Sequence, residues 1–204
     1  TETTGALDTN GNLYGYINYT LPNGININGG TEASNNDSRT NAVSSNNTYV
    51  AWCWKAGGST TVTNNEGSVT SHVSANTDAG FSIVKWTGNS NSSTTIGHGL
   101  NQKPEFLILK NTSGTENWRV YYTIVDGSYD FMYLNTNGAV NHSGYALPTS
   151  TVANKADDVN ERMISYCWHS VPGYSKFGFY LGNGQASNGS FVDCGFEPAV
   201  VIFK

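Results

Sequence analysis

The sequence predicts an all-β fold, and three observations support this prediction. Short runs rich in aromatic and β-branched residues recur along the whole chain, separated by clusters of Gly, Asn and Ser. Helix signals are almost absent, and one set of strand-like segments occurs twice in the same order. Frequent short strands without crossover helices favour antiparallel sheets. We therefore expect two related, β-sandwich-like repeats with an N-terminal hairpin and long polar loops.

The N-terminal part differs from the rest of the chain. Its segment LYGYINYTLPNGININ is predicted to be a hairpin with its turn at Pro22, Asn23 and Gly24, and a polar loop follows as far as Asn47. Strands are expected, in chain order, near 13–19, 49–55, 60–64, 68–74, 81–87, 105–110, 117–124, 130–134, 162–168, 175–181, 190–194 and 199–203. The one helical candidate, 154–164, has no sustained apolar face, so we expect a single turn at most.

The repeated set consists of three segments. YVAWCWKAGG (49–58), FSIVKWTGN (81–89) and PEFLILK (104–110) return as MISYCWHSVPG (163–173), SKFGFYLGN (175–183) and PAVVIFK (198–204). The similarity includes the spacing, because Gly88 to Pro104 and Gly182 to Pro198 are both sixteen positions apart. A repeated β unit is the expected cause.

The repeat predicts how the chain is divided. We expect an N-terminal hairpin and loop at 1–48, a first repeat at 49–116, linking strands and a loop at 117–161, and a second repeat at 162–204. The first copy continues into NWRVYYT (117–123), whereas the second has no such continuation. Because an uncovered edge strand promotes aggregation, we expect the second repeat to be truncated or completed by a neighbour. Pairing of its last strand inside the domain is the alternative.

The composition is polar but carries little charge. Asn, Gly, Thr and Ser make up 92 of the 204 residues, and only 12% are charged, against about a quarter in typical domains. Such a surface is typical of extracellular and virion β-proteins. The net charge is −5 and the basic residues are scattered, which argues against nucleic acid and anionic membranes as partners. No stretch approaches the roughly 20 apolar residues of a membrane span.

Three cysteines are present, and none belongs to a C-x-x-C pair. Cys53 and Cys167 occupy the same position in the two copies, and we expect both to be buried free thiols. A disulfide between them is the alternative, which would require the two repeats to pack with these strands in contact. Cys194 has no counterpart and is expected to be a free thiol.

No constellation of catalytic residues stands out. The four histidines, His72, His98, His142 and His169, form no HExxH motif, and the sequence contains no GxSxG motif and no phosphate-binding loop. No pair of carboxylates lies in an aromatic setting, as glycoside hydrolysis would need. DTNGN (8–12) lacks the glycine and glutamate of an EF-hand, which leaves an irregular calcium site at Asp157, Asp158 and Glu161 as an alternative. We therefore predict that the chain is not an enzyme and that it has no cofactor and no metal site.

Aromatic side chains are the candidate recognition residues, because exposed Trp and Tyr contact sugar rings and partner surfaces. Four of them recur in both copies and are expected in the core: Trp52, Trp54, Tyr166 and Trp168. The middle segment has no counterpart, and it supplies the binding candidates Trp118, Tyr121, Tyr122, Tyr129 and Tyr133, with the loop 141–160 beside them. His98 is a further candidate because its flanking glycines allow close approach of the backbone, with simple loop variation as the alternative.

The order of several segments resembles a known family: YVAWCWKAGG, SVTSHVSANTDAGFSIVKWTGN, TIGHGLNQKPEFLILKN, NWRVYY, GYSKFGFYLGNG and GFEPAVVIFK. The family consists of uncharacterised β-repeat domains in large virion proteins of tailed bacteriophages, especially marine ones, and the resemblance covers residues 49–204. It implies a tail-fibre-like module at the virion surface, involved in host attachment and without catalytic residues. The partners implied are other copies of the chain, neighbouring virion proteins and a host-surface glycan.

Other classes of function remain open at this point. A capsid-decoration or head-fibre protein would use the same fold for assembly alone. An extracellular adhesin or filament subunit would favour a strand donated between chains. An enzyme that cleaves host polysaccharide is the most distant alternative, and it would need a cleft with paired carboxylates.

Overall fold

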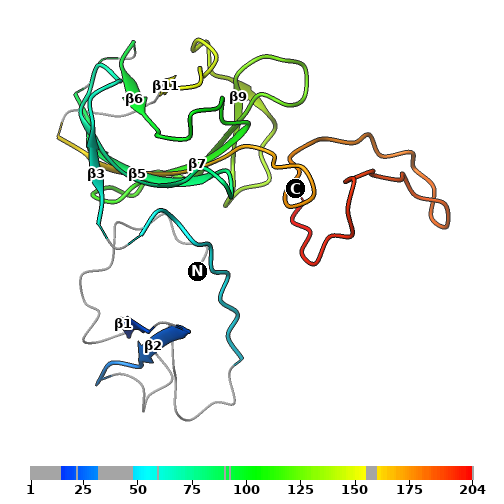
Figure 1. Cartoon of the computed structure of the whole chain (residues 1–204). Coiled ribbons are helices and arrows are strands. Elements are labelled where there is room, and N and C mark those ends of the chain that lie inside the picture. Colours follow the sequence, from blue (N-terminus) through cyan, green and yellow to red (C-terminus); the bar gives the residue numbers. More distant parts are fainter. Residues whose placement is uncertain are drawn as a thin grey trace. The chain divides into compact units, whose positions relative to one another are not determined.

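The computed structural model describes residues 15–21, 23–31, 48–58, 60–89, 91, 93–154 and 160–203. It confirms the all-β fold, since every named element in the described residues is a strand (Figure 1). The chain divides into two compact units, Thr1–Cys53 and Trp54–Lys204. Several predictions lie outside the described residues: the segment 8–12, the calcium candidates Asp157 and Asp158, and positions 155–159 of the helical candidate.

The first unit contains the predicted hairpin. Strand β1 (Tyr16–Leu21) pairs antiparallel with β2 (Gly24–Asn28), and Leu21 lies opposite Gly24. The register shifts between Ile17 and Tyr19, which indicates a bulge in β1. This confirms the hairpin that the Pro-Asn-Gly sequence predicts.

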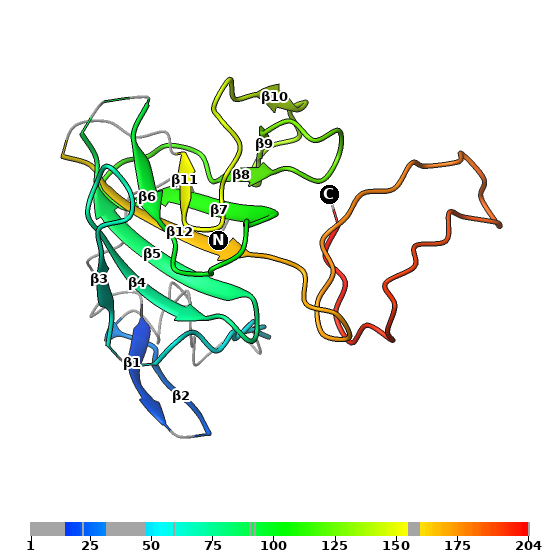
Figure 2. The same ribbon diagram turned by 45° about the horizontal axis from the view of Figure 1, so that its top comes forward.

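The second unit is built on one antiparallel sheet of eight strands. In the chain these are β3 (Val62–Asn64), β4 (Ser71–Asn76), β5 (Phe81–Thr87), β7 (Phe106–Asn111), β8 (Arg119–Tyr122), β9 (Asp130–Tyr133), β10 (Asn141–His142) and β12 (Arg162–Trp168). In space their order is β10-β9-β8-β7-β12-β5-β4-β3, as Figure 2 shows. The last strand in the chain, β12, therefore lies in the middle of the sheet.

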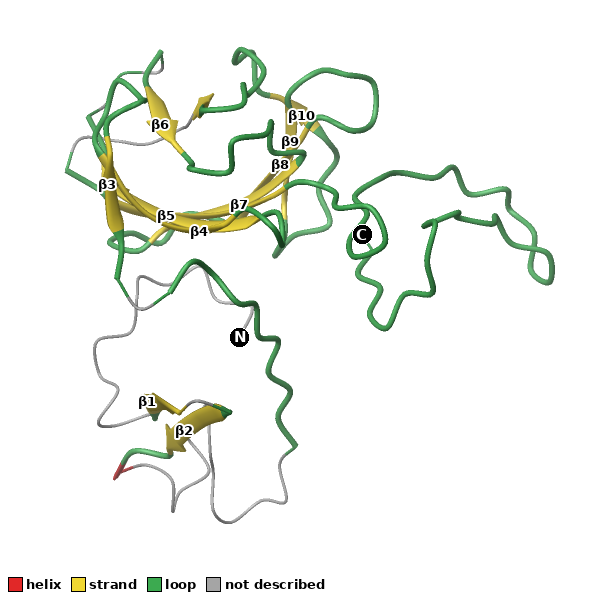
Figure 3. Ribbon diagram, in the orientation of Figure 1, coloured by secondary structure: helices red, strands yellow, loops and turns green. Residues whose placement is uncertain are grey.

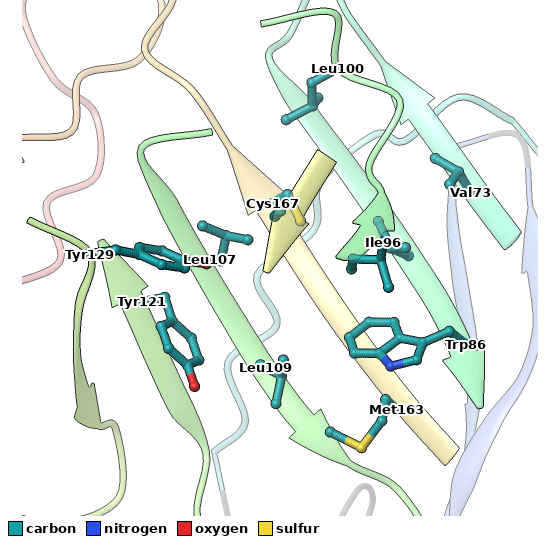
Figure 4. Packing of buried hydrophobic residues seen from close by; sticks show 12 residues of the cluster. Val73, Trp86, Ile96, Leu100, Leu107, Leu109, Tyr121, Tyr129, Met163 and Cys167 are labelled. Atoms are coloured by element: carbon teal, nitrogen blue, oxygen red, sulfur yellow. The ribbon is translucent and has the colours of Figure 1, made fainter. Parts of the chain in front are cut away.

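A second, smaller layer gives the unit its sandwich-like character. Strands β6 (Thr95–Gly97) and β11 (Val152–Asn154) pair with each other and lie over the inner face of the curved sheet (Figure 1). Ile96 of β6 and Ala153 of β11 pack into the same buried cluster as side chains from β4, β5, β7, β8 and β12 (Figure 4). Burial alternates along β12, where Met163, Ser165 and Cys167 are buried, as expected for a strand with one face on a core.

The turn between β4 and β5 requires glycine at its last position. Gly80 has a φ of +63°, and a side chain there would meet the carbonyl oxygen of His169 at 2.7 Å. Its N–H group donates to the carbonyl of Thr77, which closes the turn. Only glycine adopts this conformation without strain at such a close approach, so Gly80 fixes the register of the β4–β5 hairpin.

Four of the expected strands are wrong. The segments 49–55, 175–181, 190–194 and 199–203 have strand-like sequences but form no strand, and Figure 3 shows residues 176–203 as loop. A strand needs a partner for its backbone groups, and local sequence does not reveal whether one is present. Short strands β6, β10 and β11 were not anticipated, because two or three residues are too few to show a period.

The two repeats do not fold as two separate sandwiches in the described part of the chain. Strand β12 belongs to the second copy, yet it pairs with β5 and β7, which belong to the first. The expected burial of Cys53 and Trp52 is also wrong, since both are exposed, whereas that of Cys167 is confirmed. All three cysteines are free, so the alternative of a Cys53–Cys167 disulfide is not realised.

Candidate functional site

Aromatic side chains gather at one end of the eight-stranded sheet. The register of β12 places Trp168 opposite Phe81 at the start of β5 and opposite Phe106 at the start of β7. The ring centroid of Trp168 lies 4.9 Å from that of Phe81, in a stacked arrangement, and 5.8 Å from that of Phe106. Cross-strand aromatic pairs of this kind stabilise a sheet. The three strands are thus joined by one row of rings.

Further rings extend this row toward solvent. Trp54 meets Trp168 edge-on at 5.9 Å, and Phe177 stacks on Phe106 at 5.4 Å. With Tyr166, which stacks on Trp168 at 6.3 Å, these residues form what we call the aromatic end cluster: Trp54, Phe81, Phe106, Tyr166, Trp168 and Phe177.

The cluster has a buried base and an open rim. Phe81 and Trp168 are buried, whereas Trp54 exposes 47% of its surface. The core position expected for Trp168 is therefore confirmed, while that expected for Trp54 is wrong. Partly exposed rings on a rigid base supply apolar area at little entropic cost, and they can contact a sugar ring or a partner protein.

A second feature is an exposed histidine held by a buried carboxylate. His142 of β10 donates from Nδ1 to Oδ1 of Asp130 on β9 at 2.7 Å, and the two residues are direct partners across the strand pair. The His142 side chain is 80% exposed, while that of Asp130 is 5% exposed. The hydroxyl of Ser128 lies 2.8 Å from Oδ2 of Asp130 and 2.6 Å from Oδ1 of Asp126.

This arrangement lacks the order of a catalytic triad. In a triad the carboxylate orients the histidine and the histidine takes the proton of the nucleophile. Here the hydroxyl of Ser128 bonds to the carboxylates of Asp126 and Asp130 rather than to His142. The geometry therefore fixes the His142 ring at the sheet edge without activating a nucleophile.

The His142–Asp130 contact predicts a pH dependence of the sheet edge. The hydrogen bond to Asp130, and then its charge, raise the pKa of His142. A raised pKa in the folded state means that the contact adds stability below the unfolded value of about 6.5 and loses this contribution as the pH rises through the folded pKa. We expect an NMR titration to give His142 a pKa above 6.5, and amides of β10 to exchange faster above it.

A change at the partner provides the control for this titration. In an Asp130→Asn variant the pKa of His142 should return toward 6.5. A global unfolding curve would not isolate the effect, because burial lowers the pKa of His98, which makes the contribution of His98 opposite in sign. An unchanged His142 pKa in the Asp130 variant would contradict the assignment.

Three of the aromatic residues predicted to bind a partner lie in the interior. Tyr121, Tyr122 and Tyr129 are all buried, and Tyr121 packs against Tyr129 at 5.1 Å and Phe131 at 5.3 Å. Burial raises the pKa of Tyr121 to about 12. The rings of these three tyrosines are covered by neighbouring side chains. Trp118 and Tyr133 are partly exposed, and their role in binding stays a prediction.

His98 is also part of the interior. Its ring is fully buried, Nε2 lies 3.2 Å from the carbonyl oxygen of Thr149, and the N–H of Leu100 donates to Nδ1. Since Nδ1 accepts, the proton resides on Nε2 and the ring is neutral, which agrees with its lowered pKa. His98 joins the loop after β6 to the turn before β11 and thereby holds the small sheet in place.

The described residues contain neither a cluster of possible metal ligands nor a helix that could span a membrane. Nowhere in these ranges do three or more His, Cys, Asp or Glu side chains gather closely enough to hold a metal ion. The part of the chain that the structure covers also contains no apolar helix of the length that a bilayer crossing requires.

Comparison with known proteins places the chain in a family. The family described as "Domain of unknown function (DUF7483)" matches residues 4–204. The chain belongs to the DUF7483 family. No curated protein and no solved structure matches the sequence significantly. The DUF7483 match spans the N-terminal hairpin, the eight-stranded sheet and both copies of the repeated segments.

Sequence reasoning missed the two features that the fold of this DUF7483 chain brings together. Phe81 and Phe106 each open a strand, but only the position of β12 between them makes them neighbours of Trp168. Asp130 and His142 are separated by 12 residues in the sequence. They meet only because β9 pairs with β10. Neither pairing leaves a local signal in the sequence.

Proposed function

We propose that this chain is a non-enzymatic structural module of a phage virion, part of a tail fibre or similar appendage, which contributes to attachment to the host surface. The observation that carries the proposal is the aromatic end cluster, a partly exposed patch of rings on a rigid antiparallel sheet. The polar, weakly charged composition supports the same reading. Other copies of the chain, neighbouring virion proteins and a host glycan are the partners proposed.

Immunogold labelling of native particles tests the location. An antibody raised against this chain should place gold on the tail or its fibres. Gold over the head would replace the proposal with a capsid-decoration or head-fibre function, and gold on cellular filaments would replace it with an adhesin or filament subunit. Absence of label from virions that contain the intact chain by mass spectrometry would show that the epitope is internal and would contradict a surface role.

Attachment itself can be tested at the open rim of the aromatic end cluster. Replacing Trp54 by alanine should weaken binding of the fluorescently labelled chain to host cells by at least about fivefold, because truncating an aromatic hot-spot residue costs more than about 1 kcal/mol. Flow cytometry at several concentrations gives the apparent Kd. Tyr174, exposed at 62% and outside the cluster, provides the matched control as Tyr174→Ala. Equal binding by both variants would exclude the cluster as the attachment site.

A separate observation favours the alternative of a capsid-decoration or head-fibre protein that serves assembly alone. Large apolar side chains are exposed at many positions within residues 179–203, including Leu181 at 79% and Phe191 at 89%. Large apolar side chains exposed in such number favour contact with another protein. A head-fibre or decoration protein would use such surface for contact within the particle, and the labelling experiment decides between the two.

A further inference from the structure

The repeated segments supply one complete set of strands to the sheet and leave one set unused. The sheet takes β5 and β7 from the first copy and β12 from the second, with β12 between the other two. The counterparts of these strands are 175–181 for β5, 198–203 for β7 and 49–54 for β12. None of the three counterparts forms a strand.

The three segments that form no strand expose large apolar side chains, whereas β5, β7 and β12 bury such side chains or pair them across the sheet. In the segment that corresponds to β12, Val50 and Trp52 are highly exposed. In the segments that correspond to β5 and β7, the exposed apolar residues are Phe179, Tyr180, Leu181, Val200, Val201, Ile202 and Phe203. Strands of this composition gain stability only when their backbone groups are paired and one face is covered.

We propose that the unused set assembles between two copies of this chain, with residues 49–53 of one copy inserted as the central strand between residues 175–181 and 198–203 of the other, while Trp54 keeps its contact with Trp168 of its own sheet. The β5–β12–β7 arrangement is the template for this insertion. Strand addition of this kind combines main-chain hydrogen bonds with alternating side-chain contacts. The inference rests on the repeat and the sheet order, and it does not depend on the virion function proposed above.

The order of the segments along the chain favours a second copy as the donor. Within the sheet, β5 and β7 precede β12 in the sequence. In the unused set the order is reversed, because 49–54 precedes the eight-stranded sheet and 175–203 follows it. Joining two copies head to tail restores the order of the template. Such a contact is heterologous, so it extends into a ring or a filament.

The template also fixes the register. Cys167 lies opposite Leu107 of β7 and Ser82 of β5. Its counterpart Cys53 is therefore expected opposite Val201, the counterpart of Leu107. Tyr166 lies opposite Ile108, which places Trp52 opposite Ile202 in the inserted strand. An aromatic ring beside a β-branched residue is a favourable cross-strand pair.

The pair formed by Cys53 and residue 201 has the right geometry for a disulfide. In the template, the N–H of Thr112 donates to the carbonyl of Arg162, which marks this pair as hydrogen-bonded. Hydrogen-bonded and non-hydrogen-bonded pairs alternate along antiparallel strands, so Cys167 and Leu107 form a non-hydrogen-bonded pair. In a non-hydrogen-bonded pair the Cα atoms lie about 4.5 Å apart, closer than in a hydrogen-bonded pair. This distance falls within the range that a disulfide spans.

Cross-linking between two different chains tests the proposal. One chain carries Cys194→Ser and keeps Cys53, and the other carries Cys53→Ser, Cys194→Ser and Val201→Cys. Diamide, which accepts the two hydrogens of the thiol pair, is added to an equimolar mixture. We expect a mixed disulfide dimer on non-reducing gels that dithiothreitol reverses. Because residue 201 lies in a segment without regular structure, its substitution should leave the sheet folded, which circular dichroism checks.

The neighbouring residue supplies the matched control. Ile202 is as exposed as Val201, but its side chain would point to the opposite face of the completed sheet. An Ile202→Cys partner should form the mixed dimer at least tenfold more slowly. Equal rates for the two variants, or no dimer with either, would overturn the insertion. A disulfide confined to one chain, when Cys53 and Val201→Cys are combined in a single protein, would overturn the assignment to a second copy.

Discussion

Replacing Trp86 by alanine is expected to lower the free energy of unfolding of the eight-stranded sheet unit by about 3–5 kcal/mol. Trp86 lies on β5, is 4% exposed and pairs across the sheet with Met163. Its indole lies in the buried cluster beside Ile96 of the small sheet (Figure 4). Truncation removes contacts with both layers and leaves a cavity. Since domains are stable by only about 5–15 kcal/mol, this is a large fraction of the total.

Urea denaturation followed by circular dichroism measures this loss. Lys85 precedes Trp86 on the same strand, points to the opposite face and is exposed, so Lys85→Ala should change stability by no more than about 0.5 kcal/mol. A Trp86→Ala variant as stable as the Lys85 control would mean that the small sheet β6–β11 does not cover this face. The comparison thus tests the layering of the fold rather than strand propensity alone.

The sequence predicts the central strands well because they carry a sustained pattern. The expected ranges 81–87 and 162–168 coincide with β5 and β12, and β7 is shifted by one residue from the expected 105–110. The same pattern at 49–55 and 175–181 predicts strands that do not form. A local pattern shows that a segment is suited to form a strand. Whether it pairs depends on a partner strand, which only the three-dimensional arrangement supplies.

The exposure of the candidate binding residues was harder to predict for a related reason. Alternation along a strand tells which residues share a face, but it does not tell which face is covered. Tyr121 and Tyr129 resemble surface aromatics in a polar segment, yet they pack on each other in the core. Trp54 belongs to a strand-like run that resembles β12, yet half of its surface is open. The composition predicts a function at a surface, but it does not indicate which residues carry that function.

The β7–β8 connection provides the second large effect, at Lys110. The Lys110 side chain is 4% exposed, and its ammonium donates to the carbonyl oxygens of Asn111 at 2.8 Å, Glu116 at 3.0 Å and Gly114 at 3.2 Å. Three donors of one ammonium thereby satisfy three acceptors of one loop. A single side chain at the end of β7 holds the whole connection to β8.

Replacing Lys110 by methionine is expected to lower the free energy of unfolding by about 3 kcal/mol. Methionine keeps the length and apolar stem of lysine but donates nothing, and each buried carbonyl left without a donor costs about 1–3 kcal/mol. The total for the three carbonyl groups stays near the lower end of this range because water can reach part of the loop. Hydrogen exchange should show the largest increase at amides 112–118, next to the lost contacts.

Lys103→Met is the matched control, because Lys103 precedes β7 and is exposed. It should leave both the unfolding curve and the exchange of the loop unchanged. If Lys110→Met behaved like this control, the loop would be held by its own turn residues, such as Asn111, whose side-chain oxygen accepts from Ser113. A selective loss of loop protection with an intact core would instead show that the hydrogen bonds donated by Lys110 order the connection between two central strands.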